Sequence, residues 1–200
     1  KLSLAELADT VVRSGATVVH LTAGLFRQFV PRQLAALAAV RLVMCGGDTV
    51  PPEQFAAARD GLSGELVACY GCTENTVFTT LHRATAGTDP LSPVPLGEPL
   101  RGTGVRVLAD DLSPVAPGET GMIYVSGGQV SGEYQEKGSL LDNDGWFCTR
   151  DPDDAIAAVR EHLRQGIVPQ NNAPLLAQRG EGRGEVAEKS RSSKPNRRRL

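Results

Sequence analysis

Cys69-Tyr70-Gly71-Cys72-Thr73-Glu74-Asn75-Thr76 supplies a glycine, a hydroxyl and a carboxylate within four residues, at the end of an apolar run. The apolar run at residues 66–69 is typical of a buried strand, and Gly71 lets the backbone turn after it. Thr73 and Glu74 should therefore emerge at the end of a strand, which is where ligands bind in open α/β sheets. Thr73 could donate a hydrogen bond to a phosphoryl oxygen, and Glu74 could hold a divalent cation, because hard cations take oxygen ligands. The simpler alternative is an ordinary helix start with Thr73 as its N-cap.

The residues before this stretch alternate between helical and strand patterns. Apolar positions at helical spacing predict helices over residues 2–13, 25–30, 31–39 and 53–59. Short apolar runs predict strands over residues 17–21, 40–44 and 66–69. This alternation indicates a mostly parallel sheet with helices packed on it. Gly46-Gly47-Asp48 follows one predicted strand, and the stretch quoted above (residues 69–76) follows the next. The two turns could therefore flank one ligand.

The pattern changes after residue 83, where closely spaced prolines and glycines interrupt helices. β-Rich runs at residues 105–108 and 122–125, separated by turn residues, predict a small antiparallel sheet or barrel over residues 97–147. Residues 153–164 predict one amphipathic helix. Residues 179–200 hold eight Lys or Arg and three Glu with almost no core-forming side chains, so we expect a disordered tail.

The whole-chain composition is that of a soluble globular protein. The 200 residues are 40% hydrophobic and 22% charged, and a formal net charge of −2 predicts no nucleic-acid or membrane partner. The sequence shows no leader peptide and no apolar run approaching the ~18 residues of a membrane span. We therefore expect a cytoplasmic protein.

The four cysteines are widely spaced, which fits reduced thiols rather than a disulfide framework. Cys69 and Cys72 form a C-x-x-C, which could be a redox pair or half of a zinc site. No second C-x-x-C or C-x-x-H accompanies it, so a metal or redox role is the less favoured hypothesis.

Several short motifs resemble, in their order, the adenylation domains of nonribosomal peptide synthetases, which are adenylate-forming, AMP-binding enzymes. Tyr70-Gly71-Cys72-Thr73-Glu74 resembles the family's Y-G-P-T-E core, with cysteine at the proline position. His20-Leu21-Thr22-Ala23-Gly24-Leu25-Phe26 is similar to the family's pocket-lining strand and turn, and Gly46-Gly47-Asp48 is similar to its G-G-D or G-G-E turn. Pro95-Leu96-Gly97-Glu98-Pro99 resembles P-I-G-x-P, and residues 118–128 resemble G-E-x-G-E-L-x-I-x-G-G.

The resemblance covers most of residues 1–151 and implies a partial large N-terminal subdomain of an adenylate-forming enzyme. Residues 1–95 would form its α/β sheet part, and residues 96–151 would form a small β-barrel-like part. Residues 152–200 resemble nothing in the family and would be a tail with one helix followed by disorder.

The resemblance also implies roles for individual residues. Thr73 and Glu74 would be catalytic, with Thr73 on the AMP phosphoryl group and Glu74 on Mg²⁺. Asp151 would accept hydrogen bonds from the ribose hydroxyls, because it matches the aspartate of the family's Y-R-T-G-D. The rest of the ATP site would comprise Gly46, Gly47, Tyr70 and Gly71, with Tyr70 bordering adenine and the glycine pair against the ring.

The amino-acid pocket implied by position is mostly apolar, which favours an uncharged hydrophobic substrate. It would include His20, Met44, Gly46, Cys69, Val77 and Phe78. Taken alone, His20 fits a hydrogen-bonded core histidine better.

Departures from the family pattern bear on activity. Residues 147–151 read Phe-Cys-Thr-Arg-Asp where the family has Y-R-T-G-D, so Arg150 takes a glycine position where a tight turn is expected. The family's phosphate loop and C-terminal lysine have no counterpart in residues 1–200. We therefore predict a fragment that is inactive alone.

The parent reaction would activate an amino acid with ATP, for thioesterification onto the phosphopantetheine of a peptidyl carrier protein or another synthetase module. The alternatives are an acyl- or aryl-CoA ligase fragment, and a non-catalytic remnant that binds nucleotide or a partner.

Overall fold

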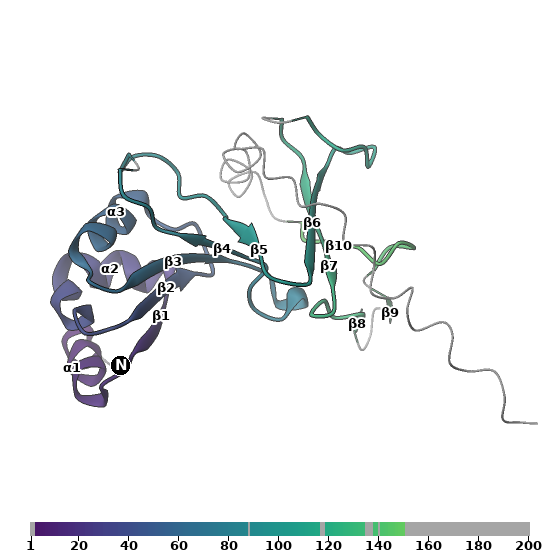
Figure 1. The fold of residues 1–200 in the computed structure, drawn as a ribbon. Coiled ribbons are helices and arrows are strands. Elements are labelled where there is room, and N and C mark those ends of the chain that lie inside the picture. The colour runs from purple at the N-terminus through teal and green to yellow at the C-terminus, as the bar shows by residue number, and fades with distance from the viewer. Residues whose placement is uncertain (1–2, 88, 117–118, 135–137, 140, 151–200) are drawn as a thin grey trace, which may run out of the picture.

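The computed structural model describes residues 3–87, 89–116, 119–134, 138–139 and 141–150. The helix and disordered tail predicted beyond residue 152 lie outside these residues. The larger part of the fold is a five-stranded sheet in the order β1-β2-β3-β4-β5 (Figure 1). Its strands are β1 (Val18–Thr22), β2 (Leu42–Gly46), β3 (Glu65–Tyr70), β4 (Thr80–Arg83) and β5 (Glu98–Pro99).

Strand direction changes once along this sheet. β1, β2 and β3 are parallel, whereas β4 is antiparallel to β3 and β5 is antiparallel to β4. The chain returns from β3 to β4 through a loop at residues 71–79, because antiparallel neighbours need no crossover helix. The predicted α/β class is confirmed, and the sheet is mixed.

Three helices accompany the parallel strands: α1 (Leu4–Ser14), α2 (Ala23–Gln33) and α3 (Pro52–Gly61). α1 begins with a capping box, in which the Ser3 side chain accepts from the Glu6 N–H and the Glu6 carboxylate accepts from the Ser3 N–H. It ends at Gly15, whose φ of 63° is left-handed. Within the part of the chain that the structure describes, every helix is too short or too polar to cross a membrane.

The separate helix predicted over residues 31–39 is wrong. α2 continues through Pro31 to Gln33, and a short 3₁₀ helix, η1 (Leu34–Leu37), follows it. Proline removes one backbone donor, but Phe29 and Val30 just before it are buried, and their packing holds the helix together at that point.

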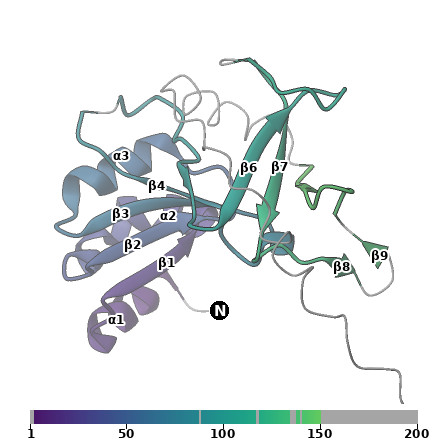
Figure 2. The ribbon, with the colours of Figure 1, turned by 45° about the vertical axis from the view of Figure 1, so that its right-hand side comes forward.

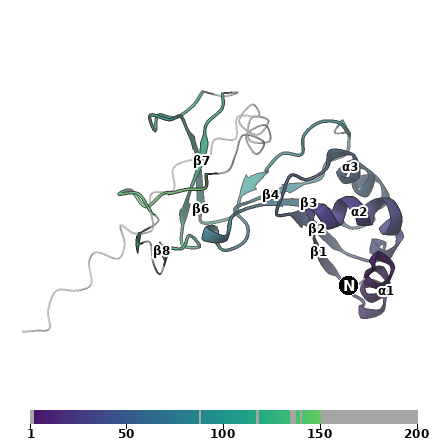
Figure 3. The ribbon, with the colours of Figure 1, turned by 180° about the vertical axis from the view of Figure 1, so that it is seen from behind.

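The main core lies between the helices and one face of the sheet. Strand residues Val43, Cys45 and Leu66 pack there with Phe26 and Phe29 of α2. Figures 1 and 3 show the three helices on the same side of the sheet. The other face therefore has no helical cover among the described residues.

A second sheet of three antiparallel strands follows, in the order β10-β7-β6. Its strands are β6 (Thr103–Leu108), β7 (Met122–Gly127) and β10 (Phe147–Cys148). Figure 2 shows β6 and β7 side by side. This confirms the predicted small antiparallel sheet. β8 (Glu133–Tyr134) pairs antiparallel with β9 (Gly138–Ser139). At the start of the β6–β7 connection, Leu112 has a φ of 64° and is 60% exposed.

The two sheets meet at the end of β3. Ile123, Val125 and Phe147 form a second core, against which Tyr70 and Cys72 pack. The stretch at residues 69–76 therefore lies between the large sheet and the small one.

Candidate functional site

The uncovered face of the large sheet carries most of the residues predicted for the amino-acid pocket. His20 and Met44 are register partners across β1 and β2, and Gly46 and Cys69 are partners across β2 and β3. Partners share a face of a sheet, and alternate residues such as Val43 point into the helix-covered core. His20 is exposed, so its interpretation as a core histidine is wrong.

Phe78 approaches this face from the loop after β3. Its ring lies edge-on to the His20 ring, with 5.5 Å between centroids and 69° between planes. Val77, the remaining predicted pocket residue, is 56% exposed. The geometry thus joins His20 of β1 to Phe78, although 57 residues separate them in the sequence.

Thr73 and Glu74 lie in a single 3₁₀ turn, η2 (Thr73–Asn75), directly after β3. The residue before the turn is Cys72, which makes no side-chain cap, so the alternative of an ordinary helix with Thr73 as N-cap is wrong. Thr73 is exposed and Glu74 is half-buried. A hydroxyl and a carboxylate are therefore presented at the carboxyl end of a parallel strand, as the sequence predicts.

The loop folds back on Gly71 and is tied internally. A Cβ at Gly71 would overlap the Val77 carbonyl oxygen, so only glycine fits there. Asn75 is fully buried, and its Nδ2 donates to the Thr79 hydroxyl at 2.8 Å, while its Oδ1 has no hydrogen-bond partner. The sequence motif names neither Asn75 nor Thr79 as structural, and only burial identifies them.

The two glycines after β2 have different roles. A Cβ at Gly46 would overlap the backbone carbonyl oxygen of Cys69, so Gly46 permits the close approach of β3. Gly47 has a φ of 80°, and a Cβ there would meet no atom within 4 Å. Gly47 is therefore the one beside which a ligand has room.

Burial makes the thiols near this site poor nucleophiles. Desolvation is the main cause that raises the pKa of Cys45 to about 12 and that of Cys69 to about 11. Neither Cys69 nor Cys72 forms a disulfide. The residues that the structure describes contain no group of three or more His, Cys, Asp or Glu that could hold a metal ion.

The tight turn expected at residue 150, in the motif at residues 147–151, is present. Arg150 has a φ of 57°, the left-handed conformation that glycine adopts without strain. The Thr149 N–H donates to the Ile123 carbonyl at 3.0 Å, which anchors this segment on β7. Asp151, predicted to bind ribose, lies outside the described residues.

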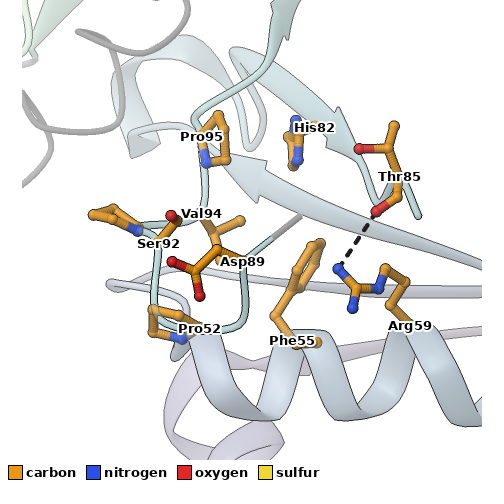
Figure 4. Close-up of a pocket in the computed structure, with 11 residues that line it drawn as sticks. Pro52, Phe55, Arg59, His82, Thr85, Asp89, Ser92, Val94 and Pro95 are labelled. Atoms are coloured by element: carbon orange, nitrogen blue, oxygen red, sulfur yellow. Dashed lines mark hydrogen bonds between the residues drawn. The ribbon is translucent and has the colours of Figure 1, made fainter. Parts of the chain in front are cut away.

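A hollow on the helix-covered side is a different feature. Figure 4 shows Phe55 and Arg59 on α3 below His82 of β4, with Asp89 on the opposite wall. Arg59 donates to the Thr85 carbonyl at 3.4 Å and pairs with Asp60 at 2.7 Å. His82 points to the face opposite that of His20, because its register partner Ala68 belongs to the main core. The hollow is thus separate from the predicted ligand face.

The fold and this strand-end site match one family of enzymes. Residues 1–135 match the family described as AMP-binding enzyme. The chain therefore belongs to the AMP-binding enzyme family.

Its relatives within that family are peptide synthetases. The chain is 35% identical over 134 residues to one component of the linear gramicidin synthase of Brevibacillus parabrevis, an alignment that covers 66% of this chain and 2% of that protein. It is 33% identical over 136 residues to surfactin synthase subunit 1 of Bacillus subtilis (strain 168), which covers 66% of this chain and 4% of that protein. The chain thus spans only a small share of the length of these relatives.

Solved structures of adenylation domains share the fold. The N-terminal subdomain of NpsA from Klebsiella oxytoca, in complex with 3-hydroxybenzoyl-AMSN, matches with a TM-score of 0.66 and 27% identity, over 76% of this chain and 42% of that one. NpsA-ThdA, an artificially fused adenylation-PCP di-domain, matches with a TM-score of 0.65 and 27% identity, over 75% of this chain and 32% of that one. The chain thus corresponds to a segment of a nonribosomal peptide synthetase adenylation domain, as the motifs predict.

Proposed function

We propose that residues 1–151 supply one wall of the ATP- and amino-acid-binding site of an adenylation domain. The whole domain would join the carboxylate of an amino acid to the α-phosphorus of ATP, release pyrophosphate, and pass the acyl group to a carrier thiol. The single observation that carries this proposal is the meeting of two turns at the carboxyl ends of β2 and β3, where Gly47 has open space beside it and Thr73 presents its hydroxyl.

The residues of this wall fit a magnesium nucleotide. Thr73 would donate a hydrogen bond to a phosphoryl oxygen, and Glu74 would supply the protein carboxylate for Mg²⁺. A single carboxylate is enough, because Mg²⁺ in such sites takes most of its remaining ligands from phosphates and water. When bound, the ion would offset the charge of the phosphates. Tyr70, packed at the junction of the two sheets, would border the adenine, with Gly46, Gly47 and Gly71 forming the backbone beside it.

The amino-acid side would lie on the uncovered face of the sheet. His20, Met44 and Phe78 present imidazole, thioether and phenyl groups there, a surface that suits an uncharged hydrophobic side chain. Asp151 would accept hydrogen bonds from the ribose diol, because a carboxylate can accept two at once. A peptidyl carrier protein would be the partner, as in the fused di-domain above.

Calorimetric titration of the 200-residue chain with Mg²⁺-ATP tests the nucleotide wall. We expect measurable binding that Thr73→Val weakens by about tenfold or more, since a hydrogen bond to a charged group contributes about 1.5–3 kcal/mol. Glu74→Gln should weaken binding in Mg²⁺ while leaving binding in EDTA unchanged. Thr10→Val is the matched control, because the Thr10 hydroxyl donates only to the Glu6 carbonyl within α1.

Two outcomes would contradict the proposal. If the wild-type chain did not bind Mg²⁺-ATP, the proposed nucleotide-binding site would be refuted. Equal losses of affinity in Thr73→Val and Thr10→Val would show that the effect is nonspecific. Because residues 1–200 contain no counterpart of the family's phosphate loop or lysine, we also expect no amino-acid-dependent ATP/pyrophosphate exchange by this chain. Exchange above background would refute that expectation.

A further inference from the structure

Three hydrogen bonds join the ligand loop at residues 73–78 to the segment that follows β7. The Ser131 N–H donates to the Glu74 carbonyl at 2.6 Å, and the Thr76 hydroxyl donates to the Gln129 carbonyl at 2.7 Å. The Gln129 side chain completes the set, because its Nε2 donates to the Phe78 carbonyl at 2.9 Å. These bonds connect segments more than 50 residues apart in the sequence.

Gln129 is the only one of these residues that holds the loop on both sides of Val77. Its backbone carbonyl accepts from Thr76, and its side chain donates to Phe78. Thr76 needs such support, because its φ of 69° is left-handed and unfavourable for a β-branched residue. Strained residues keep such conformations only where surrounding contacts fix them.

We propose that Gln129 is a positioning residue. It fixes Phe78 against His20 and so holds Phe78 at a constant position relative to Thr73 and Glu74. The inference rests on the proposed function of the loop, and Gln129 itself touches no substrate. Phe78 contributes its ring to the pocket face, whereas its carbonyl is held by Gln129 from the turn after β7. A residue in the turn after β7 would thereby set the shape of a pocket that lies on the large sheet.

Gln129→Met tests the donor, because methionine keeps the length of the side chain and removes the N–H. Amide hydrogen exchange should show protection of residues 75–79 reduced by about fivefold or more, with helices α1–α3 unchanged. Mg²⁺-ATP affinity should fall several-fold. Ser113→Ala is the matched control, because it removes a hydroxyl bonded to Asp111 in the β6–β7 connection without touching the ligand loop.

Gln129→Glu adds a pH-dependent readout that a general packing role would not give. At pH 7.5 the introduced carboxylate faces the Phe78 carbonyl without a proton to donate, so loop protection should fall as in Gln129→Met. Near pH 4.5 the protonated carboxyl can donate, and protection relative to wild type at the same pH should recover.

The outcomes separate the two proposals. Unchanged loop protection in Gln129→Met, no recovery of Gln129→Glu at low pH, or an equal loss of protection in the helices would each overturn the positioning role. Failure of the wild-type chain to bind Mg²⁺-ATP would overturn the proposed function, and hydrogen exchange would still decide whether Gln129 fixes the loop.

Discussion

Gly46→Ala is the substitution that tests how the ligand-binding edge of the sheet is built. A Cβ at Gly46 would overlap the carbonyl oxygen of Cys69 and lie 3.0 Å from its carbonyl carbon. Both atoms belong to the backbone of β3, whose residues 66–69 are buried, so neither can rotate away. Alanine should therefore force β2 and β3 apart at their carboxyl ends.

The expected loss follows from two contributions. Overpacking in a well-packed interior costs about 1–3 kcal/mol, and each weakened hydrogen bond at the end of the β2–β3 ladder contributes about 0.5–1.5 kcal/mol. The free energy of unfolding should fall by about 1.5–4.5 kcal/mol, the sum of the overpacking cost and one weakened hydrogen bond. Gly47→Ala is the matched control, because its open surroundings leave only the left-handed penalty of about 1–2 kcal/mol.

Urea unfolding followed by far-UV circular dichroism measures both variants, together with Gly24→Ala in α2. Alanine at Gly24 meets no atom within 4 Å and should raise the unfolding free energy by about 0.5–1 kcal/mol, since glycine disfavours a helix. A Gly46→Ala variant as stable as Gly47→Ala would refute the close approach of β2 and β3.

Two further predictions concern backbone strain and buried thiols. Arg150→Gly should raise the unfolding free energy by about 1 kcal/mol in the same urea assay, because it relieves a left-handed arginine; unchanged stability would count against this strain. Burial raises the pKa of the Cys45 thiol to about 12, so the folded state favours the protonated form. The contribution of this thiol to the free energy of unfolding should be complete below about pH 8.5. It should decline as pH rises toward 12, by at most about 1.4 kcal/mol per pH unit. Cys45→Val should flatten the stability profile between about pH 9 and 11, and an unaltered slope would show that Cys45 is not its source.

The parallel strands were predictable because each is a short apolar run that ends at glycine or before a polar turn. β4 was not, since Thr80, His82 and Arg83 give it a polar sequence while its partner β3 is buried. The boundary at Pro31 was misplaced because proline commonly opens a helix, whereas here the packing of neighbouring Phe29 holds α2 together through it.

The candidate site likewise has some residues that could be placed from the sequence and others that could not. Thr73 and Glu74 could be placed from the motif alone, because a strand, a glycine and a polar pair have one simple spatial arrangement. The exposure of His20 depends on which face the helices cover, and the contact of Gln129 with Phe78 depends on how two distant segments meet. Local sequence patterns carry information about neither.

The β6–β7 connection lies at the far end of the small sheet from the ligand loop. Thr103 pairs with Gly127 at the loop end of these strands, and Leu108 pairs with Met122 at the other, about 16 Å away for a five-residue rise. A fluorophore or affinity tag attached at the exposed Leu112 should therefore leave nucleotide binding unaltered. This gives an attachment point for immobilising the chain and following nucleotide binding directly.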